Sequence, residues 1–132
     1  MRNVILIVSA IFIVQTGFAL KSEVPISQLY LVADDGTFLG TFENESASNS
    51  IFNRYGTYGS PYNSNSIFNK YGTYGSDYSQ YSPFNAYTSY APWIVDKQGN
   101  RYGRLSINKY GQDVTNDSYK LAVELKAMRD AM

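Results

Sequence analysis

The chain has 132 residues, with 11 basic and 11 acidic side chains and neither cysteine nor histidine. A formal net charge of zero gives no electrostatic footprint for nucleic acid or for an anionic membrane surface, so neither is expected as a partner of the mature chain. The missing cysteines exclude disulfides and thiolate metal sites, and without histidine a Ser-His-Asp or Cys-His triad is impossible. We therefore expect no cofactor and no enzymatic activity.

The first 19 residues are predicted to form an export signal. Arg2 precedes an almost unbroken apolar run over residues 4–14, and Gly17 and Ala19 are the small residues of a cleavage site. The run is short for a membrane span, which takes about 20 residues. Cleavage would leave one small domain, residues 20–132, in the periplasm or outside the cell. An uncleaved signal would instead anchor the protein in the membrane, and this alternative stays open.

The first element expected in the mature chain is a β-hairpin over residues 29–42. Residues 29–33 are aliphatic and aromatic, as in a strand, and residues 37–42 return as a partner strand. Between them Asp34, Asp35 and Gly36 are typical of a tight turn, because glycine accepts positive φ.

Residues 50–91 carry a repeat with a period of 16 residues. The sequence Ser-Ile-Phe-Asn-(Arg/Lys)-Tyr-Gly-Thr-Tyr-Gly-Ser begins at Ser50 and again at Ser66, and a degenerate third copy begins at Ser82. Glycine or proline interrupts every few residues, which excludes a long regular element, and the aromatic content favours ordered turns over disorder. A single helical turn capped by serine and a turn closed by an asparagine side chain are both compatible with each copy.

A second hairpin is predicted over residues 93–107, on the same plan as the first. The two return arms share a Gly-x-x-x-Gly spacing, Gly36 with Gly40 and Gly99 with Gly103, and the second glycine of each arm indicates a bulge or a close backbone contact. Two and a half copies are too few for a free-standing solenoid, so the repeat insert is expected to pack on the hairpins. Residues 106–111 resemble the repeat with the phenylalanine removed, either as a partial copy or by coincidence.

The last element expected is a helix over residues 116–131, capped by Thr115 or one of the two residues after it. Its apolar stripe is predicted to contain Leu121, Leu125, Met128 and Met132, with Arg129 facing elsewhere and Lys126 paired with Asp130. This stripe is expected to cover one face of the hairpin sheet. The fold class is thus α+β, with two β-hairpins in a small antiparallel sheet, a turn-rich repeat insert and a C-terminal helix.

The repeat pattern, followed by Pro92-x-x-x-Asp96-x-x-Gly99-x-x-x-Gly103-x-Leu105-x-x-Asn108, resembles small exported bacterial proteins of unassigned function. The resemblance covers residues 50–108 and implies export and bacterial origin. It implies nothing about chemistry, and the first copy departs from the second at Pro61 and Asn63.

The candidate binding residues are the repeat tyrosines, because tyrosine, serine, glycine and asparagine are the residues that adaptable recognition surfaces use. These tyrosines are Tyr55, Tyr58, Tyr62, Tyr71, Tyr74 and Tyr78. They could instead form the insert's own core with its isoleucines and phenylalanines, and both interpretations hold if alternate tyrosines point outward. The leading hypothesis is an exported, non-catalytic structural or binding module at the bacterial envelope, with a protein or a polysaccharide as its partner.

Four further hypotheses stay open. Tyrosine faces suit a carbohydrate-binding protein, and stretches of low charge can self-assemble. A glycan hydrolase needs two carboxylates about 5–9.5 Å apart, and Asp34, Asp35 and Asp96 are the candidates. All three are in predicted hairpin turns, where aspartate commonly bonds the local backbone. Calcium binding at Asp34 and Asp35 is the remaining possibility, although the helix–loop–helix calcium spacing is absent.

Overall fold

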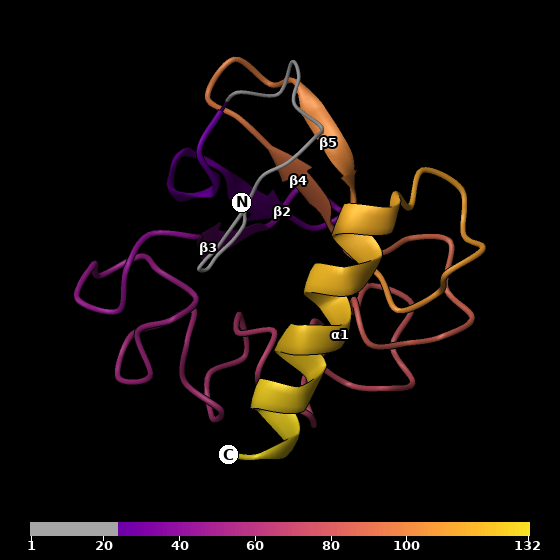
Figure 1. The fold of residues 1–132 in the computed structure, drawn as a ribbon. Coiled ribbons are helices and arrows are strands. Elements are labelled where there is room, and N and C mark those ends of the chain that lie inside the picture. Colours follow the sequence, from indigo (N-terminus) through magenta and orange to yellow (C-terminus); the bar gives the residue numbers. More distant parts are fainter. Residues whose placement is uncertain (1–23) are drawn as a thin grey trace.

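The computed structural model describes residues 24–132, so the predicted export signal lies outside the described residues (Figure 1). The elements in chain order are the 3-10 helix η1 (Ile26–Gln28), β2 (Tyr30–Val32), β3 (Phe38–Thr41), β4 (Trp93–Val95), β5 (Arg101–Arg104) and α1 (Asn116–Asp130). Within the described residues no helix is both long and apolar enough to cross a membrane.

The strands form one sheet in the order β3-β2-β4-β5, and every neighbouring pair is antiparallel. The central strands β2 and β4 face each other with Leu31 opposite Ile94, so that the two hairpins join through their first strands. The α+β prediction, with two hairpins in a small antiparallel sheet and a C-terminal helix, is confirmed.

The two hairpins share their backbone irregularities. Gly36 and Gly99 close the turns with φ of +91° and +86°, and Gly40 and Gly103 both have φ of +110°. The strand register shifts in both hairpins, and a Cβ on Gly40 would lie only 2.7 Å from the Cβ of Tyr58. The glycine spacing predicted a bulge or a close contact, and both features are present.

Between residues 42 and 92 the chain forms consecutive turns and no helix or strand, apart from an isolated bridge at Ser50. In the second copy the backbone N–H of Asn69 donates to the Ser66 carbonyl, and the backbone N–H of Gly72 donates to the Asn69 backbone carbonyl. The first copy repeats both bonds sixteen residues earlier. The buried Ser66 hydroxyl accepts from the Phe68 amide at 3.0 Å, so the serine satisfies a backbone group that water cannot reach.

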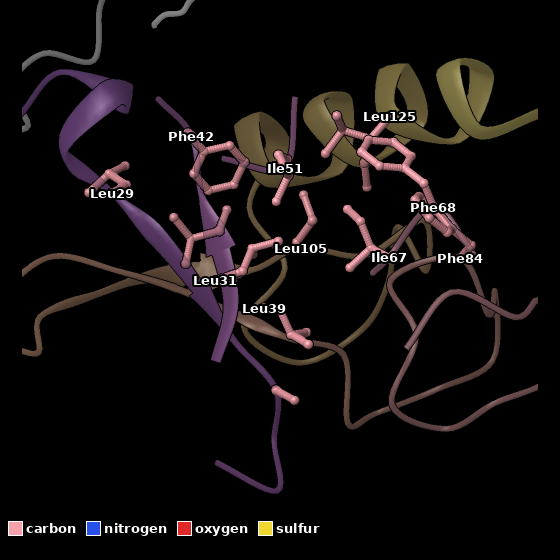
Figure 2. Packing of buried hydrophobic residues seen from close by; sticks show 13 residues of the cluster. Leu29, Leu31, Leu39, Phe42, Ile51, Ile67, Phe68, Phe84, Leu105 and Leu125 are labelled. Carbon is pink, nitrogen blue, oxygen red and sulfur yellow. The ribbon is translucent and has the colours of Figure 1, made fainter. Parts of the chain in front are cut away.

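The insert supplies a large part of the hydrophobic core. Figure 2 shows side chains from the strands, the insert and α1 converging in one cluster, which includes Leu31, Leu39, Leu105, Leu125, Ile51, Ile67, Phe68 and Phe84. These side chains are all at most 1% exposed. The isoleucines and phenylalanines of the repeat thus pack against the sheet and the helix.

The predicted stripe of α1 is wrong in its C-terminal half. The buried residues are Ser118, Ala122, Leu125 and Arg129, whereas Met128 and Met132 are 40% and 37% exposed. Small residues line the first turns because the helix begins beside Gly103, where a Cβ would lie 3.4 Å from the Ser118 Oγ. Arg129 is buried because the insert provides partners for its guanidinium, and a hydropathy pattern does not register such partners.

The predictions at the helix ends fared better. Thr115 caps α1 in a reciprocal capping box with Ser118. The predicted Lys126–Asp130 ion pair is present, with 2.9 Å between Nζ and Oδ2. The helix ends at Asp130, one residue before the predicted boundary.

Candidate interaction surface

Six tyrosines project almost entirely into solvent. Their side chains are 89–100% exposed, and we call them the turn-tip tyrosines: Tyr55, Tyr62, Tyr71, Tyr78, Tyr87 and Tyr110. The first five each stand two residues after a serine or asparagine whose side-chain oxygen accepts their backbone N–H. The projecting rings therefore occupy one recurring position in the turn.

The asparagine turns are closed on both sides by the same side chain. Asn69 Oδ1 accepts from the Tyr71 amide at 3.1 Å, and Asn69 Nδ2 donates to the Asn63 carbonyl at 3.1 Å. The Gly72 amide completes the turn by donating to the Asn69 carbonyl at 3.0 Å. Asn53 and Asn85 make the same two side-chain bonds. Each accepts from the backbone N–H of the tyrosine two residues later and donates to a carbonyl six residues earlier. A tyrosine that follows such an asparagine is thus held at its backbone while its ring stays free.

Asn108 extends this arrangement beyond the insert. The Asn108 Nδ2 donates to the Thr88 carbonyl at 3.1 Å, and the Gly111 backbone N–H donates to the Asn108 carbonyl at 2.9 Å. The segment that resembles a repeat without the phenylalanine therefore makes the same two types of bond, across 20 residues instead of six. These bonds fasten the end of the insert to the chain that leaves β5, and they place Tyr110 at a turn tip.

Tyr58 and Tyr74 differ from the other four candidate binding residues, because they pack against the sheet. The Tyr58 ring meets Phe38 edge-on, with 5.0 Å between the ring centroids. The Tyr74 hydroxyl donates to Asp35 Oδ2 at 2.8 Å and lies 3.0 Å from Thr37 Oγ1. The Thr37 hydroxyl lowers the pKa of Tyr74, but burial and the bond to Asp35 outweigh it, so the pKa of Tyr74 is raised.

Asp35 is engaged by the same contact. Burial raises the pKa of its carboxyl, but hydrogen bonds from the Thr37 amide and the Tyr74 hydroxyl outweigh burial and lower that pKa. Its neighbour Asp34 forms an ion pair with Arg104, with 2.9 Å between Oδ1 and the guanidinium nitrogen. Both acids of the first hairpin turn are therefore engaged in polar contacts within the protein.

Asp96 occupies the opposite end of the sheet. Because Val32 pairs with Trp93 and Tyr30 pairs with Val95, the two hairpin turns are on the order of 15 Å apart along the strands. Asp96 is 5% exposed and accepts hydrogen bonds from Asn100 and from the Tyr102 hydroxyl. Burial raises the pKa of Asp96, and these bonds outweigh it and lower that pKa. The geometry does not bring Asp96 together with Asp34 or Asp35, as a paired-carboxylate site requires.

The sequence pattern missed two turn-tip tyrosines as candidates, Tyr87 and Tyr110. The signal that could have found them is local, because each stands two residues after an asparagine, Asn85 or Asn108. Among residues 24–132 no group of three or more acidic side chains is placed to hold a metal ion. Comparison of the chain with protein-family models, curated protein sequences and solved structures finds no match.

Proposed function

We propose that the chain is an exported, non-catalytic binding module of the bacterial envelope, and that it contacts its partner through the turn-tip tyrosines. The observation that carries this proposal is their exposure, because six rings between 89% and 100% exposed stand on backbone that hydrogen bonds hold in place. Export is supported by the apolar N-terminal segment and by the resemblance to exported bacterial proteins.

Physical chemistry favours such rings as contact residues. A tyrosine can bury about 150–250 Å² of surface when a partner covers it, and its hydroxyl keeps a polar tip. Tyrosine also loses little side-chain entropy on binding, since only two χ angles have to be fixed. The closed turns lower the entropic cost of binding further, because a backbone that is already fixed loses less conformational freedom when a partner binds.

The test compares the mature protein with three variants of it for co-sedimentation with isolated bacterial envelopes. Replacement of Tyr55, Tyr62, Tyr71 and Tyr78 by serine should reduce retention at least tenfold and leave the melting temperature and circular dichroism unchanged. Phenylalanine at the same four positions keeps the rings and should keep most of the retention.

The matched control replaces Tyr58 and Tyr74 by serine. Because these two rings pack against the sheet, this variant should melt at a lower temperature. At a temperature where it remains folded, it should still bind envelopes. Unchanged retention of the four-serine variant would overturn the proposal.

A further inference from the structure

Three of the turn-tip tyrosines directly follow a basic residue in the sequence. The sequence Asn-(Arg/Lys)-Tyr-Gly occurs at residues 53–56, 69–72 and 108–111, so Arg54, Lys70 and Lys109 each precede a turn-tip tyrosine. All three cations are exposed. At the third tip the Lys109 Nζ lies 5.9 Å from the centroid of the Tyr110 ring, so the charge and the ring are close to each other there.

These cations have no acidic partner among residues 24–132. The ion pairs of the described chain involve Arg104, Lys126 and Arg129. The insert, residues 50–91, contains one acidic residue, Asp77, and Arg129 pairs with it at 2.8 Å. Each of the three tips therefore offers a positive charge, without an acidic partner among the described residues, on the residue before an exposed tyrosine.

We infer that these tips bind an anionic polysaccharide, one acidic sugar at each tip. The inference rests on the proposed function and names its ligand class. The tyrosine ring would pack on the apolar C–H face of a sugar, and the neighbouring cation would pair with a carboxylate, sulfate or phosphate group on it. Repeated sites of one kind suit a polymer of repeating units, because linked weak contacts add avidity.

Charge density argues against single-stranded nucleic acid, which also combines stacking with cations. A nucleic acid carries a phosphate at every nucleotide, and proteins that bind single strands follow it with a continuous positive groove. The insert supplies one basic residue in each of its first two copies and none in the third, within a chain of zero formal net charge. Such sparse charges match a sugar polymer with occasional acidic groups.

The experiment is affinity electrophoresis of the mature protein in gels that contain a largely methyl-esterified pectin, a dextran with a low degree of sulfation, a phosphate-bearing mannan, neutral dextran or a 20-residue oligothymidylate. Retardation is expected with at least one of the three acidic polysaccharides, and the responding gel identifies the acidic group. Dextran and the oligonucleotide should cause at least tenfold weaker retardation.

The decisive variant is R54Q/K70Q/K109Q, which should lose at least tenfold in affinity for the responding polymer. The matched control K97Q/K120Q/K126Q removes the same charge elsewhere and should bind like the original protein. Stronger retention by dextran or by the oligonucleotide, or unchanged affinity of R54Q/K70Q/K109Q, would overturn the inference.

The two proposals can fail separately. If the four-serine variant loses envelope binding while R54Q/K70Q/K109Q keeps it, the tyrosines act on another ligand and only the anionic polysaccharide is refuted. If neither variant changes envelope binding, both proposals fall.

Discussion

Gly40 and Gly103 stand where the two return strands meet the segments that pack on the sheet. A Cβ on Gly40 would lie 2.7 Å from the Tyr58 Cβ, 2.9 Å from Ile51 Cγ2 and 3.0 Å from the Asn49 carbonyl oxygen. The next residue, Thr41, donates its amide to that same carbonyl at 2.8 Å. The missing side chain therefore lets the insert approach the sheet closely enough to hydrogen-bond to it.

Gly40→Ala should lower the free energy of unfolding by about 2–5 kcal/mol, because the positive φ costs about 1–2 kcal/mol and overpacking about 1–3 kcal/mol. Gly36→Ala is the matched control, since its φ is also positive and nothing lies within 4 Å of the added Cβ. It should cost only about 1–2 kcal/mol. Urea denaturation followed by circular dichroism measures the free energy of unfolding of both variants. Equal losses would show that the close contact at Gly40 does not add to the cost of the substitution.

At the scale of elements, α1 is held to the insert through Arg129. This side chain is 3% exposed, donates to the Gly75 carbonyl, pairs with Asp77 and lies over the Phe84 ring with Cζ 4.8 Å from its centroid. One residue of the helix thus satisfies a carbonyl of the second copy and covers an aromatic ring of the third. The helix and the repeats stabilise each other through this contact.

Arg129→Ala should lower the free energy of unfolding by about 3–5 kcal/mol, because it leaves a buried carbonyl without a donor and removes the packing over Phe84. Asp77→Asn removes only the partly exposed partner of the ion pair and should cost at most about 1 kcal/mol. Thermal melting at neutral pH compares the two variants. A loss as large for Asp77→Asn as for Arg129→Ala would mean that the ion pair, and not the burial, holds the helix.

At the scale of the whole molecule, the titrating contacts set the pH range of stability. The pKa values of Asp35, Asp96 and Asp130 lie below the ordinary 3.8, so their stabilisation is complete above about pH 4 and is lost as the pH falls through the lowered pKa values. At the alkaline end, burial and the Asp96 carboxylate raise the pKa of Tyr102 from 10.0 to about 12.

Because the raised pKa of Tyr102 favours the neutral phenol in the folded state, its stabilisation is complete below pH 10 and is lost between pH 10 and about 12. Tyr102→Phe should therefore be less stable than the original protein at pH 8 and should lose less stability between pH 10 and 12. Urea midpoints at pH 8, 10 and 12 test this, and equal slopes in the two proteins would contradict it.

The sequence by itself determined the elements of this protein, because their signals are local. Turn aspartates and glycines delimited both hairpins, and the Gly-x-x-x-Gly spacing predicted a bulge or a close contact at Gly40 and Gly103. The capping residues Thr115, Asn116 and Asp117 indicated where the helix begins. The 16-residue period likewise defined the insert and singled out tyrosines as candidates, since a repeated local pattern needs no knowledge of distant contacts.

Only the tertiary structure decided which side of the repeat faces the core. Tyr58 and Tyr71 were both candidate binding residues, yet Tyr58 packs against Phe38 and Tyr71 projects into solvent. Arg129 is buried although it is charged, because Gly75, Asp77 and Phe84, more than 40 residues away in sequence, provide its partners. Burial depends on what the folded chain brings alongside, and that information is spread over segments that no local pattern connects.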